Sequence, residues 1–122
     1  MKRVIFFLAL ALMLGGCETA RNFNAISSNR NRLARLTVGM PKEKVLNIMK
    51  TKPFLSREMT INNPYKIDLL VATNHRYEVF YYVIDTDVPL EADVITDQQL
   101  VPLVIENGKL VGWGWEYLHN VR

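Results

Sequence analysis

The sequence predicts an α+β domain, with helices in the first half of the chain and an antiparallel sheet in the second. Helical periodicity stops near Lys50, and from Phe54 onward apolar and polar residues alternate with the period of a β-strand. Near the C-terminus, Asn107-Gly108 separates two apolar runs, and this pair is the preferred two-residue turn of an antiparallel hairpin. We therefore expect two short N-terminal helices packed on a sheet of three to four antiparallel strands.

An apolar segment precedes the predicted domain. Lys2 and Arg3 are followed by an unbroken apolar run from Val4 to Leu14. This run is shorter than the roughly 20 residues that span a bilayer but is typical of a secretion signal. We predict a signal peptide over residues 1–16, with cleavage before Cys17. Residues 17–32 then form a polar, flexible tether that begins at this cysteine and in which Ile26 makes no core contact, and residues 33–122 form the domain.

Two helices are expected before the strands. Leu33 and Leu36 suit a short helix that docks on the domain. A longer helix is predicted from Pro41 to about Lys50, because apolar residues recur there at the i, i+3, i+4 spacing of a buried face. The residues on that face are Val45, Ile48 and Met49. Pro53 prevents the helix from continuing.

Four segments have the alternation or composition of strands: 65–69, 77–84, 100–106 and 109–115. Residues 55–61 are expected to form a further, weak strand before them. Asn74-His75 is the turn expected between residues 65–69 and 77–84. The segment from Tyr77 to Ile84 is apolar on both faces, which predicts a central strand. In the last segment Val111, Trp113 and Trp115 are expected on one face and the glycines on the other. A face without side chains favours the close approach of another element.

Charge is unevenly distributed along the chain. Between Arg21 and Arg57 there are nine basic residues and one acidic residue, whereas from Glu58 onward there are four basic and ten acidic residues. Basic residues near a membrane are attracted to anionic headgroups by about 1 kcal/mol each. The alternative is an ordinary solvated face of two helices. The residues predicted to contact an anionic membrane are Arg21, Arg30, Arg32, Arg35, Lys42 and Lys44. A protein contact is predicted for the acidic loop, at Asp85, Asp87, Glu91, Asp93 and Asp97.

No catalytic, metal-binding or cofactor-binding residues are predicted. His75 and His119 lack a Cys, His or carboxylate at the spacing of a metal site. A calcium-loop frame that starts at Asp85 places Pro89, Leu90 and Thr96 at its most constrained positions, so it fails. We expect neither a nucleic acid nor a small-molecule substrate as a partner.

The stretch Leu14-Gly15-Gly16-Cys17 resembles the lipobox of bacterial lipoproteins. The resemblance implies that the Cys17 thiol carries a diacylglyceryl group and that its new amino group carries an acyl chain such as palmitate. In that family an aspartate after the cysteine favours retention in the inner membrane. Here the sorting residue is Glu18, so we expect the outer membrane, facing the periplasm, with the inner membrane as the alternative.

The segment from Leu36 to Met49, with its Gly39-Met40 pair before a short helix, resembles the opening motif of the SmpA/OmlA (BamE-like) small lipoproteins. The closing hairpin from Val101 to Gly114 is similar to that of related lipoproteins. The resemblance implies the element order α-α-β-β-β and an accessory role in the machinery that inserts β-barrel proteins. Pro41 departs from it, because Ser or Thr usually caps that helix in the family.

The sequence therefore favours a lipid-anchored envelope protein that binds other proteins and does not catalyse a reaction. The alternative is a small periplasmic enzyme inhibitor or decoy that presents its acidic loop, Asp85 to Asp97, to a basic active site. A third hypothesis, an enzyme acting on the cell wall, needs a pair of carboxylates that the sequence does not locate.

Overall fold

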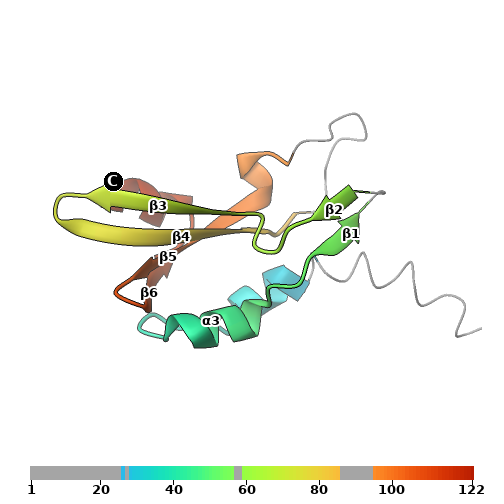
Figure 1. Ribbon diagram of the computed structural model, residues 1–122, viewed down its shortest axis with the longest axis horizontal. Coiled ribbons are helices and arrows are strands. Elements are labelled where there is room, and N and C mark those ends of the chain that lie inside the picture. Colours follow the sequence, from blue (N-terminus) through green and yellow to red (C-terminus); the bar gives the residue numbers. More distant parts are fainter. Residues whose placement is uncertain (1–25, 27, 57–58, 86–94) are drawn as a thin grey trace, which may run out of the picture.

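The structure is a computed structural model that describes residues 26, 28–56, 59–85 and 95–122. It confirms an α+β fold with a four-stranded antiparallel sheet of order β3-β4-β5-β6, and it adds a separate two-stranded sheet of β1 and β2 (Figure 1). Residues 28–33 are helical. The other elements, in chain order, are α3 (Lys42–Met49), β1 (Phe54–Ser56), β2 (Met59–Ile61), β3 (Lys66–Ala72), β4 (His75–Val83), the 3₁₀ helix η1 (Asp97–Gln99), β5 (Leu100–Glu106), β6 (Lys109–Trp113) and α4 (Trp115–Val121).

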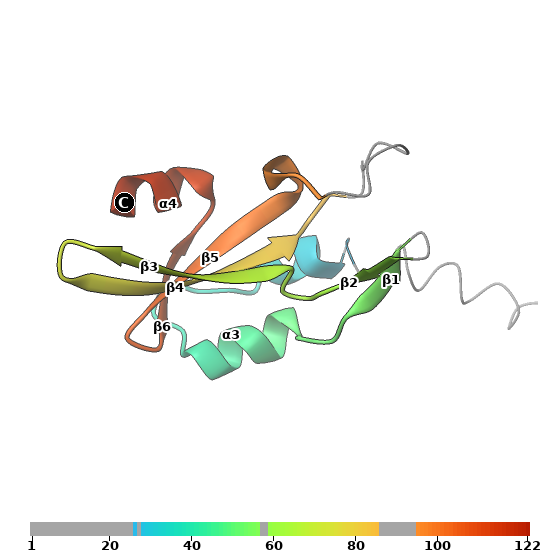
Figure 2. The ribbon, with the colours of Figure 1, turned by 45° about the horizontal axis from the view of Figure 1, so that its top comes forward.

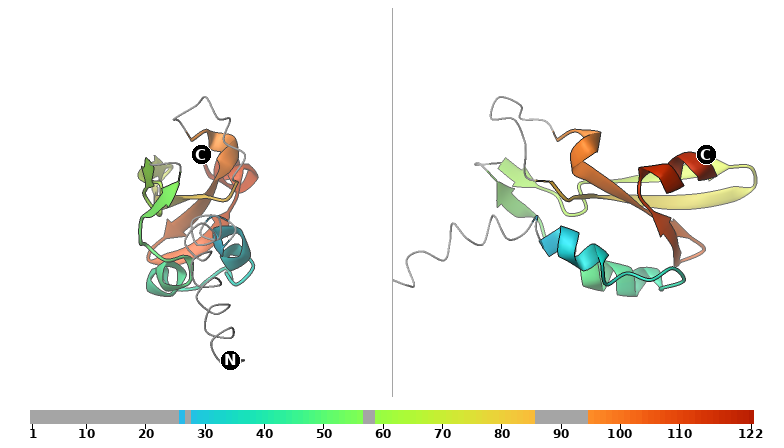
Figure 3. Two further views of the ribbon diagram at one scale, coloured as in Figure 1. Left: turned by 90° about the vertical axis from the view of Figure 1, so that its right-hand side faces the viewer. Right: turned by 180° about the vertical axis from the view of Figure 1, so that it is seen from behind.

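Helices pack on both faces of the four-stranded sheet. Figure 2 shows α4 on one side and α3 on the other, and residues 28–33 lie on the α3 side (Figure 3). β4 contributes to both cores: Val79 and Tyr81 face α4, whereas Phe80 and Tyr82 face α3. The prediction of a central strand with both faces covered is therefore confirmed. The strand begins at His75, so the predicted turn lies one residue earlier, at Thr73-Asn74.

The helix predicted from Pro41 to Lys50 is α3. Pro41 precedes it in an extended conformation, where its missing N–H breaks no helical hydrogen bond. Val45, Ile48 and Met49 are buried, as their spacing predicts. The helix ends at Lys50, whose φ of 68° leaves the helical region and whose N–H donates to the Leu46 carbonyl over 2.8 Å.

The segment before α3 is more closely attached to the core than the sequence indicates. The short helix lies at residues 28–33, and Leu36 beyond it is buried. The prediction that Ile26 makes no core contact is wrong, because only 4% of this residue is exposed and it belongs to the α4-side core. An isolated apolar residue gives no periodic signal, so its burial depends on contacts distant in the sequence.

Two strand predictions are corrected. The single weak strand expected over residues 55–61 is a hairpin, with Leu55 opposite Thr60 across β1 and β2. The strand expected over residues 65–69 is β3, which starts at Lys66 and extends to Ala72. The four-stranded sheet thus begins later in the chain than the alternation predicts.

The C-terminal hairpin is confirmed, but the chain after it differs from the prediction. Asn107 and Gly108 have positive φ values of 53° and 74°, as this type of turn requires. A β-bulge between Val104 and Ile105 shifts the register, so the expected common face of Val111, Trp113 and Trp115 is wrong. Trp115 instead begins α4. The expected close approach over a glycine is confirmed at Gly112: a Cβ built there would lie 2.6 Å from the Tyr117 ring of α4.

The β6 edge of the sheet is covered by the chain segment that leads into α3. The Gly39 N–H donates to the Leu110 carbonyl over 2.7 Å, and the Leu110 N–H donates to the Met40 carbonyl over 2.9 Å. Pro41 and Lys109 form an isolated antiparallel bridge. These contacts satisfy backbone groups of β6 that would otherwise form an open strand edge.

Candidate binding surfaces

The most unusual surface lies on β3, at the opposite edge of the sheet. Ile67, Leu69 and Val71 alternate along this strand and are 54%, 81% and 71% exposed. We call these three residues the β3 row. Side chains two residues apart share one face of a strand, so the three form a continuous apolar strip. Within the described residues, β3 pairs only with β4, and its outer edge carries no partner strand.

The β3 row lies just beyond the cover that α3 provides. Across the β3–β4 pair, Ile67 is opposite Phe80 and Leu69 is opposite Glu78. Lys42, the first residue of α3, contacts both of these β4 residues. Its Nζ lies 2.7 Å from Glu78 Oε2 and 5.5 Å from the centroid of the Phe80 ring. The β3–β4 hairpin extends past this end of α3, which leaves the row in solvent (Figure 1).

A hollow of about 420 Å³ adjoins the β3 row. Leu69 and Val71 line one part of it, and Asn107 and Gly108 in the β5–β6 turn line another. Side chains or backbone from a second molecule can therefore enter beside the row, in addition to lying along its edge. The row and the hollow together make a concave surface at the end of the sheet, in which Arg76 and Glu78 lie beside the apolar side chains.

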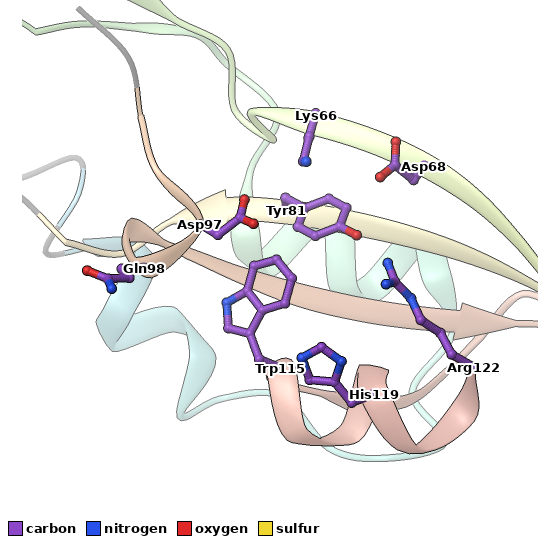
Figure 4. A pocket seen from close by; sticks show the side chains of 8 residues that line it. All are labelled: Lys66, Asp68, Tyr81, Asp97, Gln98, Trp115, His119 and Arg122. Atoms are coloured by element: carbon purple, nitrogen blue, oxygen red, sulfur yellow. The ribbon is translucent and has the colours of Figure 1, made fainter. Parts of the chain in front are cut away.

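A second cleft, of about 390 Å³, lies on the α4 side of the sheet (Figure 4). Tyr81 and Trp115 form its aromatic floor, with ring centroids 5.6 Å apart. The indole N–H of Trp115 donates to the Leu100 carbonyl over 2.9 Å, which fixes the ring. His119, one turn along α4, lies 6.5 Å from the indole, centroid to centroid.

The charged groups of this cleft have opposite signs. Lys66 and Arg122 are its cations, and Asp68 and Asp97 are its carboxylates. The Lys66 Nζ lies 4.5 Å from the centroid of the Tyr81 ring, a distance at which a cation is attracted to an aromatic face. Burial, followed by the charge of the Asp68 carboxylate, raises the pKa of Tyr81. The groups thus interact with one another, and the cleft carries no strong charge of one sign.

The structure places three members of the predicted basic set in contacts within the chain. Arg30 donates twice to the Ile84 carbonyl, over 2.7 and 3.1 Å. Arg32 donates to the Met49 carbonyl over 3.4 Å, and Lys42 pairs with Glu78 as described above. The two arginines keep their full charge, because a carbonyl is neutral. Arg35 and Lys44 are both exposed, and Arg21 lies outside the described residues.

A hollow of about 520 Å³ gathers basic side chains. Arg32, Lys50 and Lys52 line it together with Phe54 and Asn63, and the described part of its lining contains no carboxylate. It lies where residues 28–33 meet the end of α3. The sequence indicates positive charge in this half of the chain, and the structure gathers part of that charge into one hollow.

The helix at residues 28–33 is fixed by buried hydrogen bonds. Asn29 is 1% exposed, and its Nδ2 donates to Asn63 Oδ1 and to the Val83 carbonyl, each over 3.0 Å. The Lys50 carbonyl accepts from Tyr82 Oη over 3.1 Å and from Asn63 Nδ2 over 3.4 Å. Burial raises the pKa of Tyr82 to about 12. These bonds attach the N-terminal part of the described chain to the middle of the domain.

The predicted acidic set falls mostly outside the described residues. Asp87, Glu91 and Asp93 lie there, as do the lipidation residue Cys17 and the sorting residue Glu18. Asp85 follows β4, and Asp97 begins η1 and lines the cleft of Figure 4. Two of the five acidic residues are thus described, and only Asp97 among them lines a cleft named above.

Sequence reasoning missed the β3 row as a surface. The alternation from Tyr65 to Leu69 is that of a half-buried strand, which normally has its apolar face buried, but in the structure Ile67 and Leu69 are exposed. The lengths of the predicted elements could have indicated this exposure. A helix of eight residues is about 12 Å long, and a seven-residue strand is about 23 Å long. One short helix cannot cover a whole face of such a sheet.

In the described part of the chain, no helix is long and apolar enough to cross a membrane. The same residues contain no group of three or more His, Cys, Asp or Glu side chains arranged to hold a metal ion. Comparison of the chain with models of known protein families, with curated proteins and with solved structures finds no match. The candidate surfaces are therefore defined by the exposure, register and contacts of this chain's own residues.

Proposed function

We propose that this chain is a lipid-anchored, non-catalytic protein-binding module of the bacterial envelope, and that the β3 edge is its contact with protein. The β3 row carries this proposal. Large apolar side chains that alternate along an unpaired strand edge are a ready surface for strand addition. The lipobox-like sequence at Cys17 and the resemblance to the SmpA/OmlA family support the anchored, periplasmic part of the proposal.

Strand addition would use both the outer backbone edge of β3 and the apolar side chains of the β3 row. The outer N–H and C=O groups of β3 pair with an extended segment of the partner, and these backbone bonds supply affinity. The β3 row then packs against alternate side chains of that segment. Fully burying one such side chain contributes about 1.5–3 kcal/mol, so Leu69, the most exposed of the three, makes the largest contribution.

The basic hollow supports the proposed orientation on the membrane. Arg32, Lys50 and Lys52 gather beside the helix at residues 28–33, close in sequence to the start of the described chain. Cations near the surface are attracted to anionic headgroups. The β3–β4 hairpin turn lies at the far end of the sheet (Figure 1), so the apolar edge remains available to a protein in the periplasm.

Photocrosslinking in intact cells tests the protein contact. A photoreactive amino acid replaces Leu69 in one variant of the full chain and Val38 in another. Val38 is the matched control, because it is also an apolar residue with 61% exposure but lies beside the covered β6 edge. We expect protein adducts from position 69 and few from position 38. Equal capture at both positions, or none at either, contradicts the proposal.

Two further measurements test the anchor and the partner. Mass spectrometry of the mature N-terminus is expected to give Cys17 with its diacylglyceryl and acyl groups, and an intact Met1–Gly16 segment contradicts the anchor. The barrel-assembly machinery is the first partner to examine, on the basis of the family resemblance. If its components are absent from a pull-down of detergent-solubilised envelope, that specific role is excluded.

A further inference from the structure

We propose that the β3 edge binds a second copy of this chain, through antiparallel pairing of β3 with β3 about a two-fold axis at Leu69. This proposal rests on the proposed function, because it uses the same edge, and it names the occupant of that edge. The resulting dimer has a continuous eight-stranded sheet. Its two β3 rows lie on the same face and pack against each other.

The register follows from the β3 sequence. In a pairing centred on Leu69, this residue lies opposite Leu69 of the second copy, and Ile67 lies opposite Val71. Every member of the row therefore meets an apolar side chain, and cross-strand pairs of this kind stabilise a sheet. On the other face, Asp68 lies opposite Leu70 and Lys66 opposite Ala72, so no like charges are directly opposed.

Neighbouring registers are less favourable. A shift of the centre to Asp68 places two carboxylates directly opposite each other, which is destabilising. A shift to Leu70 places Ile67 opposite Thr73, in the turn after β3. A slip of one residue removes the backbone hydrogen bonds, because only alternate residues of β3 direct their N–H and C=O groups to the outer edge. Only the register centred on Leu69 pairs the whole row with itself.

The two-fold axis places the helices of both copies on the same faces of the dimer. The axis of such a pair is perpendicular to the sheet, so the α3 side faces the same way in both copies. The helix at residues 28–33 lies on that side (Figure 3), and its Leu33 packs against the same core as α3. The helices at residues 28–33 of the two copies therefore lie on the same face of the dimer.

The expected dimer is weak in solution. An interface made of one strand pair and its flanking side chains is at the small end of the range, below the roughly 1,200 Å² of stable complexes. Attachment of both copies to one membrane raises their effective concentration. We therefore expect pairing in the envelope and dissociation on dilution in detergent.

Disulfide trapping tests the register. Leu69→Cys is introduced into the full chain, and the envelope is oxidised before solubilisation. Directly opposed Cα atoms in an antiparallel pair are about 4.5–5.5 Å apart, within the 4.4–6.8 Å that a disulfide bridges. We expect a covalent dimer. The wild-type chain, whose single cysteine is Cys17, sets the background.

Two matched variants check the axis. In the proposed register Val71 is four residues out of line with Val71 of the second copy, or about 13 Å along the strand, so Val71→Cys alone is expected to stay monomeric. Co-expression of Ile67→Cys and Val71→Cys chains is expected to restore a mixed dimer. Equal trapping of Leu69→Cys and Val71→Cys overturns the register and with it the proposal.

Opposite charges introduced at position 69 distinguish a loss of dimer pairing from a loss of folding. In co-expressed Ile67→Cys and Val71→Cys chains, Leu69→Lys in both chains or Leu69→Glu in both chains places like charges opposite each other, and is expected to reduce the disulfide-trapped mixed dimer at least tenfold, with unchanged circular dichroism. Together the two variants are expected to restore a mixed dimer. If the Leu69 photocrosslinker captures other proteins but no second copy, the dimer is overturned while the protein-binding function stands. If it captures no protein, both fall.

Discussion

The two edges of the four-stranded sheet differ in their cover: the β6 edge is covered, whereas the β3 edge is exposed. At β6, the backbone of Gly39 and Met40 pairs with Leu110, and Leu110 is fully buried. At β3, the strand ends the sheet, and Leu69 is 81% exposed. Two leucines on edge strands of one sheet thus have opposite environments. The difference indicates that the β6 edge contributes to stability and that the β3 edge is available for binding.

The same difference argues against treating the β3 row as an accident of folding. Natural edge strands are usually protected by charged residues, proline, bulges or covering segments. Lys66 and Asp68 are charged, but they lie on the α4 face of β3 and line the cleft of Figure 4. The α3 face of the strand carries three apolar side chains and no charge. That face has the composition of an interface.

The largest expected effect comes from truncating the two leucines. Leu110→Ala removes a fully buried side chain and leaves a cavity, so we expect a loss of about 2–5 kcal/mol in the free energy of unfolding. Leu69→Ala is the matched control and is expected to change it by less than about 0.5 kcal/mol. Urea unfolding of the full chain, followed by tryptophan fluorescence, measures both. Similar losses for the two variants would remove the contrast between the edges.

A smaller effect is expected from the segment that covers β6. Gly39 has a φ of 93°, and a Cβ added to it would meet no atom within 4 Å, so any penalty for Gly39→Ala comes from the backbone alone. We expect a loss of about 1–2 kcal/mol. Val38→Ala, one residue earlier and exposed, serves as the control in the same unfolding experiment. A neutral Gly39→Ala would show that the cover adapts without strain.

An alkaline pH series tests how much buried Tyr82, which contacts the end of α3, contributes to the stability of the domain. Tyr82 donates to the Lys50 carbonyl at the end of α3, and burial raises its pKa from 10.0 to about 12. The folded state therefore keeps the phenolic proton after the unfolded state has lost it. Stability is expected to fall as the pH rises from about 10 to about 12. The melting temperature of the Tyr82→Phe variant is expected to fall less steeply than that of the wild-type chain over this pH range. An equally steep fall would contradict the assignment of this pH dependence to Tyr82.

The smallest effect on stability is expected from the ion pair between Lys42 of α3 and Glu78 of β4. Glu78→Gln breaks the ion pair with Lys42, whose two side chains are 30% and 36% exposed in the order lysine, glutamate. A pair this exposed contributes about 0–1 kcal/mol. We expect the loss to shrink further at high salt, because screening weakens the pair in the wild-type chain. A loss above 2 kcal/mol would mean that this contact, rather than packing, fixes α3 on the sheet.

Local signals account for the elements that the sequence predicts well. The spacing of Val45, Ile48 and Met49, the two apolar faces of β4 and the Asn107-Gly108 turn each depend on residues close together in the chain. The fold class follows from them. The C-terminal helix was missed because Trp113, Gly114 and Trp115 continue the alternation of β6. The structure interrupts it at Gly114, where φ is 97°.

The candidate site depended on information that no local pattern holds. Whether Leu69 is buried depends on how far α3 reaches over the sheet, and whether Ile26 is buried depends on a core formed by residues far along the chain. A period of two identifies the faces of a strand but does not say which face is covered. The structure therefore reverses the prediction for the β3 row and for Ile26, while it leaves the predicted elements around them in place.

The buried Asn29 contacts also determine how the domain responds to a mechanical force. A pull on the N-terminal end of the described chain reaches the helix at residues 28–33, and from there it passes through Asn29 to Asn63 and to the backbone of Val83. Val83 is the last residue of the central strand. Tension is thus distributed into the middle of the sheet and does not peel away a terminal strand. A domain held in this way keeps its shape when a force acts on that end of the described chain.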